Sequence, residues 1–511
     1  MPEPLSRREV LLSAAASVLS CGVRVVPAAG QPRGPLPNIL FILADDLGYA
    51  DLSCYGRQDY RTPVLDELAS QGVKFSNAYA NSAVCSASRT ALITGRYQYR
   101  LPVGLFEPGI GGANYGLPEG HPTLPSLLRQ QGYRTSLFGK WHLGDTPQYR
   151  PIHRGYDHFF GFLGGASDYF QFDRPMVVPG ARAGAGAGAS SAQPPLCPPP
   201  AGAGFAAASA SSAARPALDS GGDTPSQGLY EDDHHVRVSG YLTDLLADRA
   251  SDEIARCAAG RQPFFISLHF NAPHWPWEGP HDQAASRLVT DLRDMDQGSM
   301  RKYGEMVVAL DTAIGRVLQR LRESGLARET LVIFTSDNGG ERFSNDWPFI
   351  GAKGELLEGG LRIPLIVRWP ARVAAGGHCD QVLIHMDWLP TLLAAAGGTP
   401  DPRYPSDGLN LLPVLLGQRR GVSRTLFWRY HAADQQAMRE GDWKYLRIGG
   451  REYLFNLVED ERERANRRLA EPERFARMRS AWADWNATML PYPPHLLSDN
   501  PKLTGCWADR Y

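Results

Sequence analysis

One short segment constrains the fold of this chain more than any other. Residues 38–44, Asn-Ile-Leu-Phe-Ile-Leu-Ala, form a continuous apolar run with several β-favouring residues. A strand with one face in water would alternate apolar and polar residues, and this run does not. It therefore predicts a strand buried on both faces, which is typical of a parallel sheet covered by helices on either side.

Later segments alternate between helix and strand. A helix is predicted to begin at Thr62-Pro63, with Thr62 as the N-cap and Pro63 in the first position, and to end at Gly72. Further helices are predicted over residues 124–131 and 306–321, and further strands over residues 135–138 and 331–334. This alternation predicts an α/β fold, doubly wound, in which helices sandwich a large and mostly parallel sheet.

Two regions depart from this pattern. Residues 179–228 are dominated by Ala, Gly, Ser and Pro, and we interpret them as a low-complexity surface insertion. From residue 423 onward the chain changes to short strands, predicted over residues 425–430, 443–448 and 453–456, and then a helix over residues 472–485. We therefore expect a catalytic domain over residues 36–422 and a smaller C-terminal α+β subdomain, built on an antiparallel sheet, over residues 423–511.

The overall composition excludes several classes of protein. Lys and Arg number 53 against 54 Asp and Glu, a formal net charge of -1, which argues against a nucleic-acid-binding protein. No apolar run reaches the roughly 18 residues of a membrane-spanning helix. Seven cysteines in 511 residues are too few for a disulfide scaffold, and the sequence does not show which of them pair. An enzyme or a binding protein remains.

The first residues resemble an export signal. Arg7-Arg8 precede a modestly apolar stretch that ends at Leu19, and small residues follow at Ala28-Ala29. This order predicts a twin-arginine signal peptide over residues 1–29, and hence a protein exported to the periplasm or the outside of a bacterium. The alternatives are a disordered tail with a chance arginine pair, or a lipoprotein anchored through Cys21.

Polar side chains follow two of the predicted strands. Asp45-Asp46 come directly after residues 38–44, and Asp337-Asn338 come shortly after residues 331–334. Ligands of open α/β sheets lie at the carboxyl ends of the strands. Three carboxylates and one amide carbonyl that meet there would suit calcium or magnesium rather than zinc. The alternatives are a helix cap for the acidic pair and a turn for Asn338-Gly339.

Cys85 is placed at the start of a short predicted helix. The helix begins at residue 85 or 86 and ends at Gly95, so that Cys85 lies at its positive end. Arg89 follows one turn later on the same face. A thiol in this position would be a nucleophile with a lowered pKa. The alternative is a buried structural cysteine.

Several segments occur in an order that is typical of one enzyme family. They are Asn38–Gly48, Cys85–Gly95, Phe138–Gly144, Asn271–His274, Ser336–Gly340, Gly351–Lys353, Glu358–Pro364, Asp387–Thr391 and Tyr453–Leu457. Through them nearly the whole mature chain resembles the type I sulfatases of the alkaline phosphatase superfamily, including the arylsulfatases.

The resemblance implies a chemical change at Cys85. In that family the Cys of a Cys-x-Pro/Ala-x-Arg motif is oxidised to formylglycine (3-oxoalanine) by a formylglycine-generating enzyme, and the hydrated aldehyde is the nucleophile. Cys85 matches this position, with Ala87 where Pro is commoner. Arg89 and a divalent ion would lower the pKa of the hydroxyl, and Asp337 could accept its proton.

The resemblance also implies one calcium ion in each chain. The family's ligands correspond to Asp45, Asp46, Asp337 and Asn338, together with an oxygen of the modified residue 85. The positions of polar residues after the two predicted strands indicate the same four side chains without the resemblance.

Four further residues receive roles from the resemblance. Lys353 would bind the sulfate oxygens and Lys140 the modified residue, whereas His274 would protonate the departing oxygen and His142 would act as the base that expels sulfate. The alternatives are surface lysines and structural histidines. Trp275 would line a substrate pocket or pack within its loop, as would Trp277, and no role is assigned to His269.

The leading functional hypothesis is an exported, calcium-dependent sulfatase that cleaves an aryl or carbohydrate sulfate ester, so that its partner is a small molecule or a glycan. A phosphodiesterase or phosphonate monoester hydrolase with the same metal site is the first alternative. A sulfated-glycan-binding protein without turnover is the second. No Gly-x-Gly-x-x-Gly follows the first strand, which disfavours a nucleotide-binding protein.

Overall fold

The structure is a computed structural model, and it describes residues 36–109, 115–173, 228–288 and 298–494, together with residues 496 and 498. The predicted signal segment 1–29 and residues 179–227 of the predicted insertion lie outside these ranges. None of the helices in the described ranges is long and apolar enough to cross a membrane.

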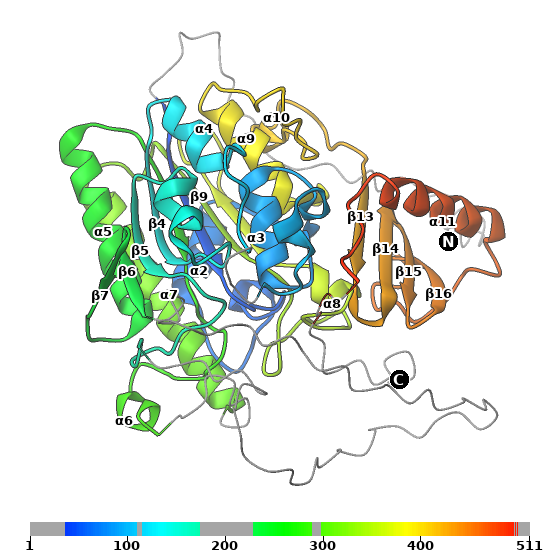
Figure 1. Cartoon of the computed structure of the whole chain (residues 1–511), viewed down its shortest axis with the longest axis horizontal. Coiled ribbons are helices and arrows are strands. Elements are labelled where there is room, and N and C mark those ends of the chain that lie inside the picture. The colour runs from blue at the N-terminus through cyan, green and yellow to red at the C-terminus, as the bar shows by residue number, and fades with distance from the viewer. Residues whose placement is uncertain are drawn as a thin grey trace, which may run out of the picture.

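A ten-stranded mixed sheet forms the centre of the described chain (Figure 1). Its strands follow one another in the order β11 (Gly377–Cys379), β2 (Val73–Phe75), β10 (Leu365–Arg368), β9 (Thr330–Ser336), β1 (Asn38–Ala44), β8 (Phe264–His269), β4 (Arg134–Lys140), β5 (His158–Phe162), β6 (Leu229–Glu231) and β7 (His234–Val236). The five strands from β9 to β5 are mutually parallel. The antiparallel pairs described in this sheet lie toward its two edges. They are β9 with β10 and β10 with β2 at one edge, and β5 with β6 and β6 with β7 at the other. The predicted large, mostly parallel sheet is confirmed.

Strand β1 lies in the middle of this sheet, between β9 and β8. All seven of its residues are buried. Alternate side chains enter opposite layers, because Ile39 and Phe41 belong to one hydrophobic cluster and Leu40 and Ile42 to the other. Both faces therefore require apolar side chains, which accounts for the unbroken apolar run in the sequence.

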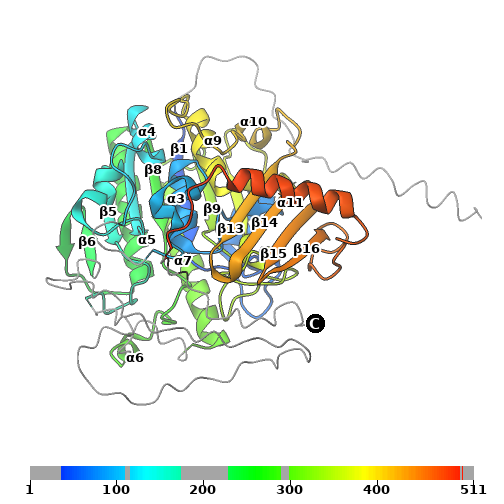
Figure 2. The same ribbon diagram turned by 45° about the vertical axis from the view of Figure 1, so that its right-hand side comes forward.

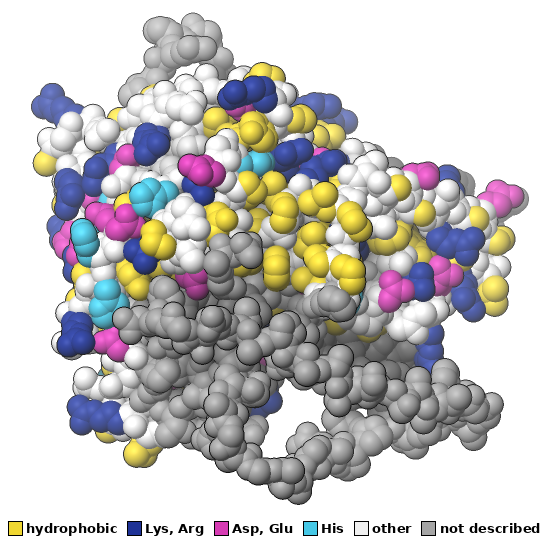
Figure 3. Space-filling model, viewed as in Figure 1, with side chains coloured by type: hydrophobic (Ala, Val, Ile, Leu, Met, Phe, Trp, Pro, Cys, Tyr) yellow, Lys and Arg dark blue, Asp and Glu magenta, His cyan; other side chains and the backbone are white. Residues whose placement is uncertain are grey.

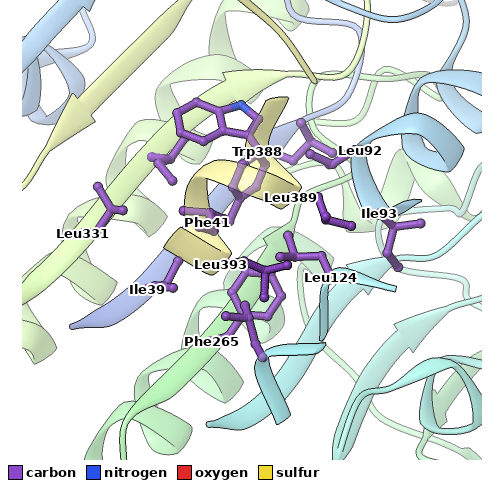
Figure 4. Close-up of a cluster of buried hydrophobic side chains, with 14 of the residues drawn as sticks. Ile39, Phe41, Leu92, Ile93, Leu124, Phe265, Leu331, Trp388, Leu389 and Leu393 are labelled. Atoms are coloured by element: carbon purple, nitrogen blue, oxygen red, sulfur yellow. The ribbon is translucent and has the colours of Figure 1, made fainter. Parts of the chain in front are cut away.

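Helices cover both faces of the sheet. One layer contains α3 (Cys85–Thr94), α4 (Leu124–Gln130) and α9 (Trp388–Ala395). The other contains α2 (Pro63–Ser70), α5 (Leu242–Gly260) and α7 (Met300–Glu323). Figure 4 shows the first layer from within, where Phe41 of β1 lies edge-on against Trp388 at a centroid distance of 5.8 Å. The doubly wound arrangement is thus built from two separate cores.

The ends of the helices differ in places from the sequence prediction. Thr62 precedes α2 as expected, but its side chain makes no capping bond. Its hydroxyl accepts the N–H of Ser53 instead, and the first-turn N–H groups of Val64 and Leu65 donate to the carboxylate of Asp311 on α7. Thr62 is thus the N-cap residue and Pro63 the first helical residue, as predicted, but a carboxylate distant in sequence takes the place of the side-chain capping bond.

A second, antiparallel sheet of four strands stands beside the first in the described C-terminal part (Figure 2). It consists of β13 (Thr425–Tyr430), β14 (Gln435–Glu440), β15 (Trp443–Ile448) and β16 (Arg451–Asn456), with α11 (Pro472–Asn486) lying across it. Three of these strands and the helix agree with the prediction. Strand β14 was missed, because Gln-Gln-Ala-Met-Arg-Glu contains no β-branched or aromatic residue. The predicted domain limits themselves stay a prediction.

Short elements complete the described fold. Strands β3 (Ala78–Tyr79) and β12 (Leu383–Ile384) pair with each other, and the short helices are α6 (Gln283–Ser286), α8 (Glu358–Leu361) and α10 (Leu412–Leu415). In the space-filling view, apolar side chains gather in the middle of the face, over α3 and beside β13, the strand of the second sheet nearest to α3 (Figure 3).

A buried ion cluster joins the second sheet to the rest of the chain. Lys444 of β15 is fully buried, and its Nζ lies 2.9 Å from carboxylate oxygens of both Glu358 and Glu463. Glu358 lies on α8 and also binds Arg362 at 2.7 Å. Because each charge has an opposite partner, the cluster is tolerated without water.

Replacing Lys444 tests this cluster. In a Lys444→Met variant the two glutamates would lose the cation that they share, and Arg362 would remain beside Glu358 alone, so we expect the free energy of unfolding in urea to fall by about 3–5 kcal/mol. Arg447→Met on the same strand removes a half-exposed ion pair with Asp434 and should cost about 0–1 kcal/mol. Equal losses for the two variants would contradict a structural role for the buried cluster.

Candidate active site

The site lies at the carboxyl ends of the central parallel strands. Backbone hydrogen bonds join the strand ends there. The N–H of Asp337 donates to the carbonyl of Ala44 at 3.1 Å, and the N–H of Asp45 donates to the carbonyl of Ala272 at 3.2 Å. These bonds bring the loops after β9, β1 and β8 to one place. The geometry is the one expected for ligand sites in open α/β sheets.

Acidic side chains meet at this place. Ligand atoms of Asp45, Cys85 and Asp337 lie within 4.8 Å of one another, and so do ligand atoms of Asp45, Asp46 and His274. The side-chain amide of Asn338 donates to Oδ1 of Asp46 at 2.7 Å. All of these residues are buried. The structure therefore brings together the acidic residues, the amide and the cysteine that the sequence indicated.

Cys85 is the first residue of α3, as predicted, and Gly95 ends that helix in a left-handed conformation with φ of 66°. The thiol Sγ lies 3.3 Å from Nδ1 of His142. Cys85 is free, as are Cys54 and Cys257 among the described residues. Burial raises the pKa of Cys54 to about 12 and that of Cys257 to about 11. Of these three thiols, Cys85 is the one that faces a histidine and a cluster of charges.

His142 is held in one tautomer. Its Nε2 lies 2.9 Å from the carbonyl oxygen of Gly109, which can only accept a hydrogen bond, so Nε2 carries the proton. The lone pair of Nδ1 then points toward residue 85. Burial and the nearby Lys140 place the pKa of His142 well below its ordinary value. A neutral imidazole with a free nitrogen therefore faces the sulfur.

Arg89 lies behind Cys85 and is 2% exposed. Its Nη2 donates to Oδ2 of Asp337 at 2.8 Å, and its Nη1 donates to the backbone carbonyl of Lys140 at 3.1 Å. Burial alone would raise the pKa of Asp337, but Arg89 and Lys140 outweigh it and hold that pKa below its ordinary value. Arg89 thereby keeps one carboxylate of the cluster ionised.

Two lysines point into the same cluster from different elements. Lys140, the last residue of β4, has its Nζ 2.6 Å from Oδ2 of Asp45. Lys353, in the loop before α8, has its Nζ 2.6 Å from Oδ2 of Asp46. Both lysines are largely or fully enclosed. The alternative of surface lysines was therefore wrong for both.

His274 closes the cluster on the side of Asp46. Its Nε2 lies 3.5 Å from Oδ2 of Asp46, and its Nδ1 lies 2.7 Å from the carbonyl oxygen of Trp275, to which it donates. Burial, together with Lys353 and Lys140, lowers the pKa of His274 well below its ordinary value. His274 and His142 thus approach the cluster from different sides.

The donor set of this cluster fits a hard cation. Oδ1 of Asp45 and Oδ1 of Asn338 are buried and have no hydrogen-bond partner within the described structure. Burial and the charge of Asp337 raise the pKa of Asp45 well above its ordinary value, although Lys140 and Arg89 act in the opposite direction. Buried oxygen atoms with unused lone pairs are ligands that a calcium ion would satisfy.

Other residues near the site show where the sequence was and was not informative. His269, left without a role, is buried with Nδ1 3.3 Å from the carbonyl of Lys140 and 3.4 Å from Nη1 of Arg89. The signal was its position as the last residue of a buried strand. Trp277 is buried against Phe343 at a centroid distance of 4.7 Å and packs within the core, whereas Trp275 is partly exposed beside His274.

Comparison with known proteins gives a consistent result. The family model described as Sulfatase matches residues 37–398. Human N-acetylgalactosamine-6-sulfatase is 32% identical over 418 residues, which cover 78% of this chain and 69% of that protein. Mouse steryl-sulfatase is 35% identical over 484 residues, which cover 86% and 74% respectively.

One solved structure is similar to this chain over nearly the whole length of both. The crystal structure of Ps i-CgsB superimposes with a TM-score of 0.75 and 28% identity, covering 91% of this chain and 95% of the other. The same protein has been crystallised in complex with k-i-k-neocarrahexaose.

The buried histidine behind Arg89 predicts a loss of stability in acid. Burial lowers the pKa of His269 to about 3, whereas an unfolded histidine titrates near 6.5. Between these values the unfolded chain binds a proton that the folded chain does not, so stability falls as the pH falls below about 6.5. In His269→Asn, proton uptake on unfolding near pH 4.5, taken from the pH dependence of urea unfolding, should decrease by about one. An unaltered uptake in His269→Asn would refute the assignment.

Proposed function

The chain belongs to the sulfatase family, and from that premise we propose that it hydrolyses an aryl or carbohydrate sulfate ester with a formylglycine nucleophile derived from Cys85 beside one calcium ion. That it is a sulfatase, an enzyme acting on sulfate esters, follows from the family and from its sulfatase relatives. The identity of the nucleophile and of the metal is the part that is proposed.

One observation supports the proposal above all others. Cys85, Arg89 and the acidic ends of β1 and β9 meet in one buried cluster, with ligand atoms of Cys85, Asp45 and Asp337 within 4.8 Å of one another. A thiol beside two carboxylates and 3.3 Å from His142 has charged and polar groups next to its sulfur, which is unusual for a cysteine that only packs in a core. It is well placed if residue 85 carries oxygen atoms that join a metal's ligands.

The nucleophile is proposed to arise before the protein acts. Oxidised to formylglycine and hydrated, residue 85 would supply one hydroxyl that attacks sulfur and a second through which sulfate leaves by elimination. His142 is oriented for the second step, because its unprotonated Nδ1 faces residue 85 while its Nε2 is held by Gly109. Asp337, kept ionised by Arg89, is proposed to accept the proton of the attacking hydroxyl.

His274 is proposed to protonate the leaving alcohol. Its Nδ1 is occupied by the carbonyl of Trp275, so Nε2 is the nitrogen available to a substrate. Without a ligand, burial and the two lysines keep His274 neutral. The negative charge of a bound sulfate ester would offset the lysines and favour the protonated form, which is the form a general acid needs.

The charges of the cluster suit an anionic substrate. Arg89, Lys140 and Lys353 supply three positive charges, and Asp45, Asp46 and Asp337 supply three carboxylates. When bound, calcium would offset charge on the sulfate oxygens and lower the pKa of the hydroxyl at residue 85. Lys353 is less enclosed than Lys140, at 15% against 0% side-chain exposure, and it is the lysine placed to contact a sulfate that enters from solvent.

Maturation and location form part of the proposal. A formylglycine-generating enzyme would be required as a partner to convert Cys85, and the twin-arginine segment 1–29 would then export the folded protein to the periplasm or beyond. Anchoring as a lipoprotein through Cys21 is the competing possibility for the same segment.

The state of residue 85 tests the nucleophile. Protein exported by its native host should show, on mass analysis of the peptide bearing residue 85, the mass of formylglycine or its hydrate in place of a thiol. Release of sulfate from 4-nitrocatechol sulfate should fall by at least a factor of about 10³ in Cys85→Ala, because no nucleophile remains. Cys257→Ala, which removes a buried thiol on α5, should retain the activity.

Two outcomes would contradict the proposal. An unmodified thiol in fully active protein would exclude formylglycine. A higher kcat/KM on matched phosphate esters than on sulfate esters would favour the alternative of a phosphodiesterase or phosphonate monoester hydrolase.

A further inference from the structure

A pocket of about 330 Å³ lies outside the charged cluster, in the C-terminal part of the chain. It is bordered by the turn between β13 and β14, by α11 and by the segment that follows α11. We call it the C-terminal pocket, and its walls include Arg429, His431, Gln436, Trp482, Asn486 and Tyr492.

The walls combine flat rings with hydrogen-bonding groups. Trp482 and Tyr492 supply aromatic surface, whereas Gln436 and Asn486 supply amides that both donate and accept. A sterol would cover these amides and offer nothing to their remaining hydrogen-bonding capacity, which is unfavourable. A sugar ring offers C–H faces to the aromatic rings and hydroxyls to the amides. The lining thus suits a saccharide unit.

The aromatic wall is held rigidly before any ligand binds. The guanidinium of Arg429 lies between the rings of Tyr99 and Tyr492, at 4.7 and 4.3 Å from their centroids. The hydroxyl of Tyr492 donates to Oε1 of Glu107 at 2.6 Å. Because Tyr492 is fixed on its face and at its hydroxyl, it loses little freedom when it receives a ligand.

An unused donor lies in the same wall. Nε of Arg429 is buried and has no hydrogen-bond partner within the described structure, although Nη1 binds Asn486 at 2.7 Å. Arg429 is only 5% exposed. A buried N–H without a partner is costly, and this one belongs to a residue that lines the pocket.

Two short connections link the C-terminal pocket to the charged cluster. On one side, Oε2 of Glu107 accepts the N–H of His431 at 2.7 Å, and two residues later the carbonyl of Gly109 accepts Nε2 of His142 at 2.9 Å. Two residues of chain span at most about 7 Å. Glu107 and Gly109, two neighbouring positions of one segment, therefore bind His431 in the wall of the pocket and His142 in the charged cluster.

On the other side, the connection runs through Gln435. This buried residue also borders the pocket, and its Nε2 donates at 2.9 Å to the carbonyl of Gly354, next to Lys353. The pocket is thus flanked by segments that carry or contact Lys353 and His142. It is adjacent to the place where the ester would be cleaved but separate from the sulfate site itself.

We propose that the C-terminal pocket binds a sugar unit of a sulfated oligosaccharide, beyond the unit whose sulfate ester is cleaved. This inference rests on the proposed sulfate ester hydrolysis and narrows its substrate class from aryl or carbohydrate esters to oligosaccharides. Contacts remote from the reacting sulfur raise kcat/KM when the longer chain is present.

Chain length and pocket variants together test this inference. Sulfated monosaccharides and tetrasaccharides prepared from carrageenan and from chondroitin sulfate would be compared with 4-nitrocatechol sulfate, which is too small to reach the pocket. We expect the tetrasaccharide of the preferred series to have a kcat/KM at least about tenfold above that of its monosaccharide. Gln436→Ala and Tyr492→Leu should each lower kcat/KM for that tetrasaccharide by about tenfold, the value of one lost contact.

The small substrate and a matched control separate binding from damage to the fold. Gln436→Ala should stay within about twofold of the unaltered enzyme on 4-nitrocatechol sulfate. Tyr492→Leu also removes the hydroxyl that binds Glu107, so it should lower kcat/KM for the tetrasaccharide more than that for 4-nitrocatechol sulfate. Gln319→Ala, which removes an exposed glutamine on α7, should leave both substrates unaffected. Equal losses on both substrates, or no preference for the longer chain, would overturn the inference.

A binding measurement tests the C-terminal pocket without relying on turnover. Titration calorimetry with the desulfated tetrasaccharide should show a Kd that is weakened about tenfold in Gln436→Ala. If no sulfate ester were cleaved while this binding persisted, the proposed function would fail and the pocket assignment would stand. If cleavage occurred and the tetrasaccharide did not bind, the pocket assignment would fail alone.

Discussion

Opposite charges buried at the ends of β1 and β9 are the constraint on which the rest of the structure depends. Carboxylates from Asp45, Asp46 and Asp337 crowd one place, and ionised acids cannot share a dry site unless cations oppose them. Arg89 and two lysines do so from three further elements. The sheet must therefore bring α3, β4 and the loop before α8 to a single point. The same cluster leaves Oδ1 of Asp45 and Oδ1 of Asn338 without hydrogen-bond partners, as ligands for a divalent ion would be.

Much of this arrangement was predictable, because its causes are local in sequence. The unbroken apolar run of β1 shows burial on both faces, and the helix of Cys85 is delimited by residues next to it. Which side chains pair was not predictable in the same way. The carboxylate of Asp311 that replaces the capping bond expected from Thr62 lies on a helix far along the chain. Strand β14 is held by its neighbours and not by its own composition.

Buried contacts join the second sheet to the catalytic part of the chain. Lys444 joins it to α8 through Glu358, and a common hydrophobic cluster contains Ala87 of α3 and Trp428 of β13. The helix that carries Cys85 is therefore packed against the sheet that borders the C-terminal pocket. The proposed sugar pocket and the helix of the proposed nucleophile therefore share one interface. This interface could not be inferred from a motif, because it depends on contacts between distant segments.

The central claim concerns the ion that this balance of charges accommodates. A crystal structure of the mature protein grown with calcium, with anomalous differences recorded at a long wavelength, tests it most directly. The account predicts one calcium peak bound by oxygens of Asp45, Asp46, Asp337 and Asn338 and by an oxygen of residue 85, at about 2.3–2.6 Å. Absence of a peak there at saturating calcium, with Lys140 and Lys353 still paired to Asp45 and Asp46, would contradict it.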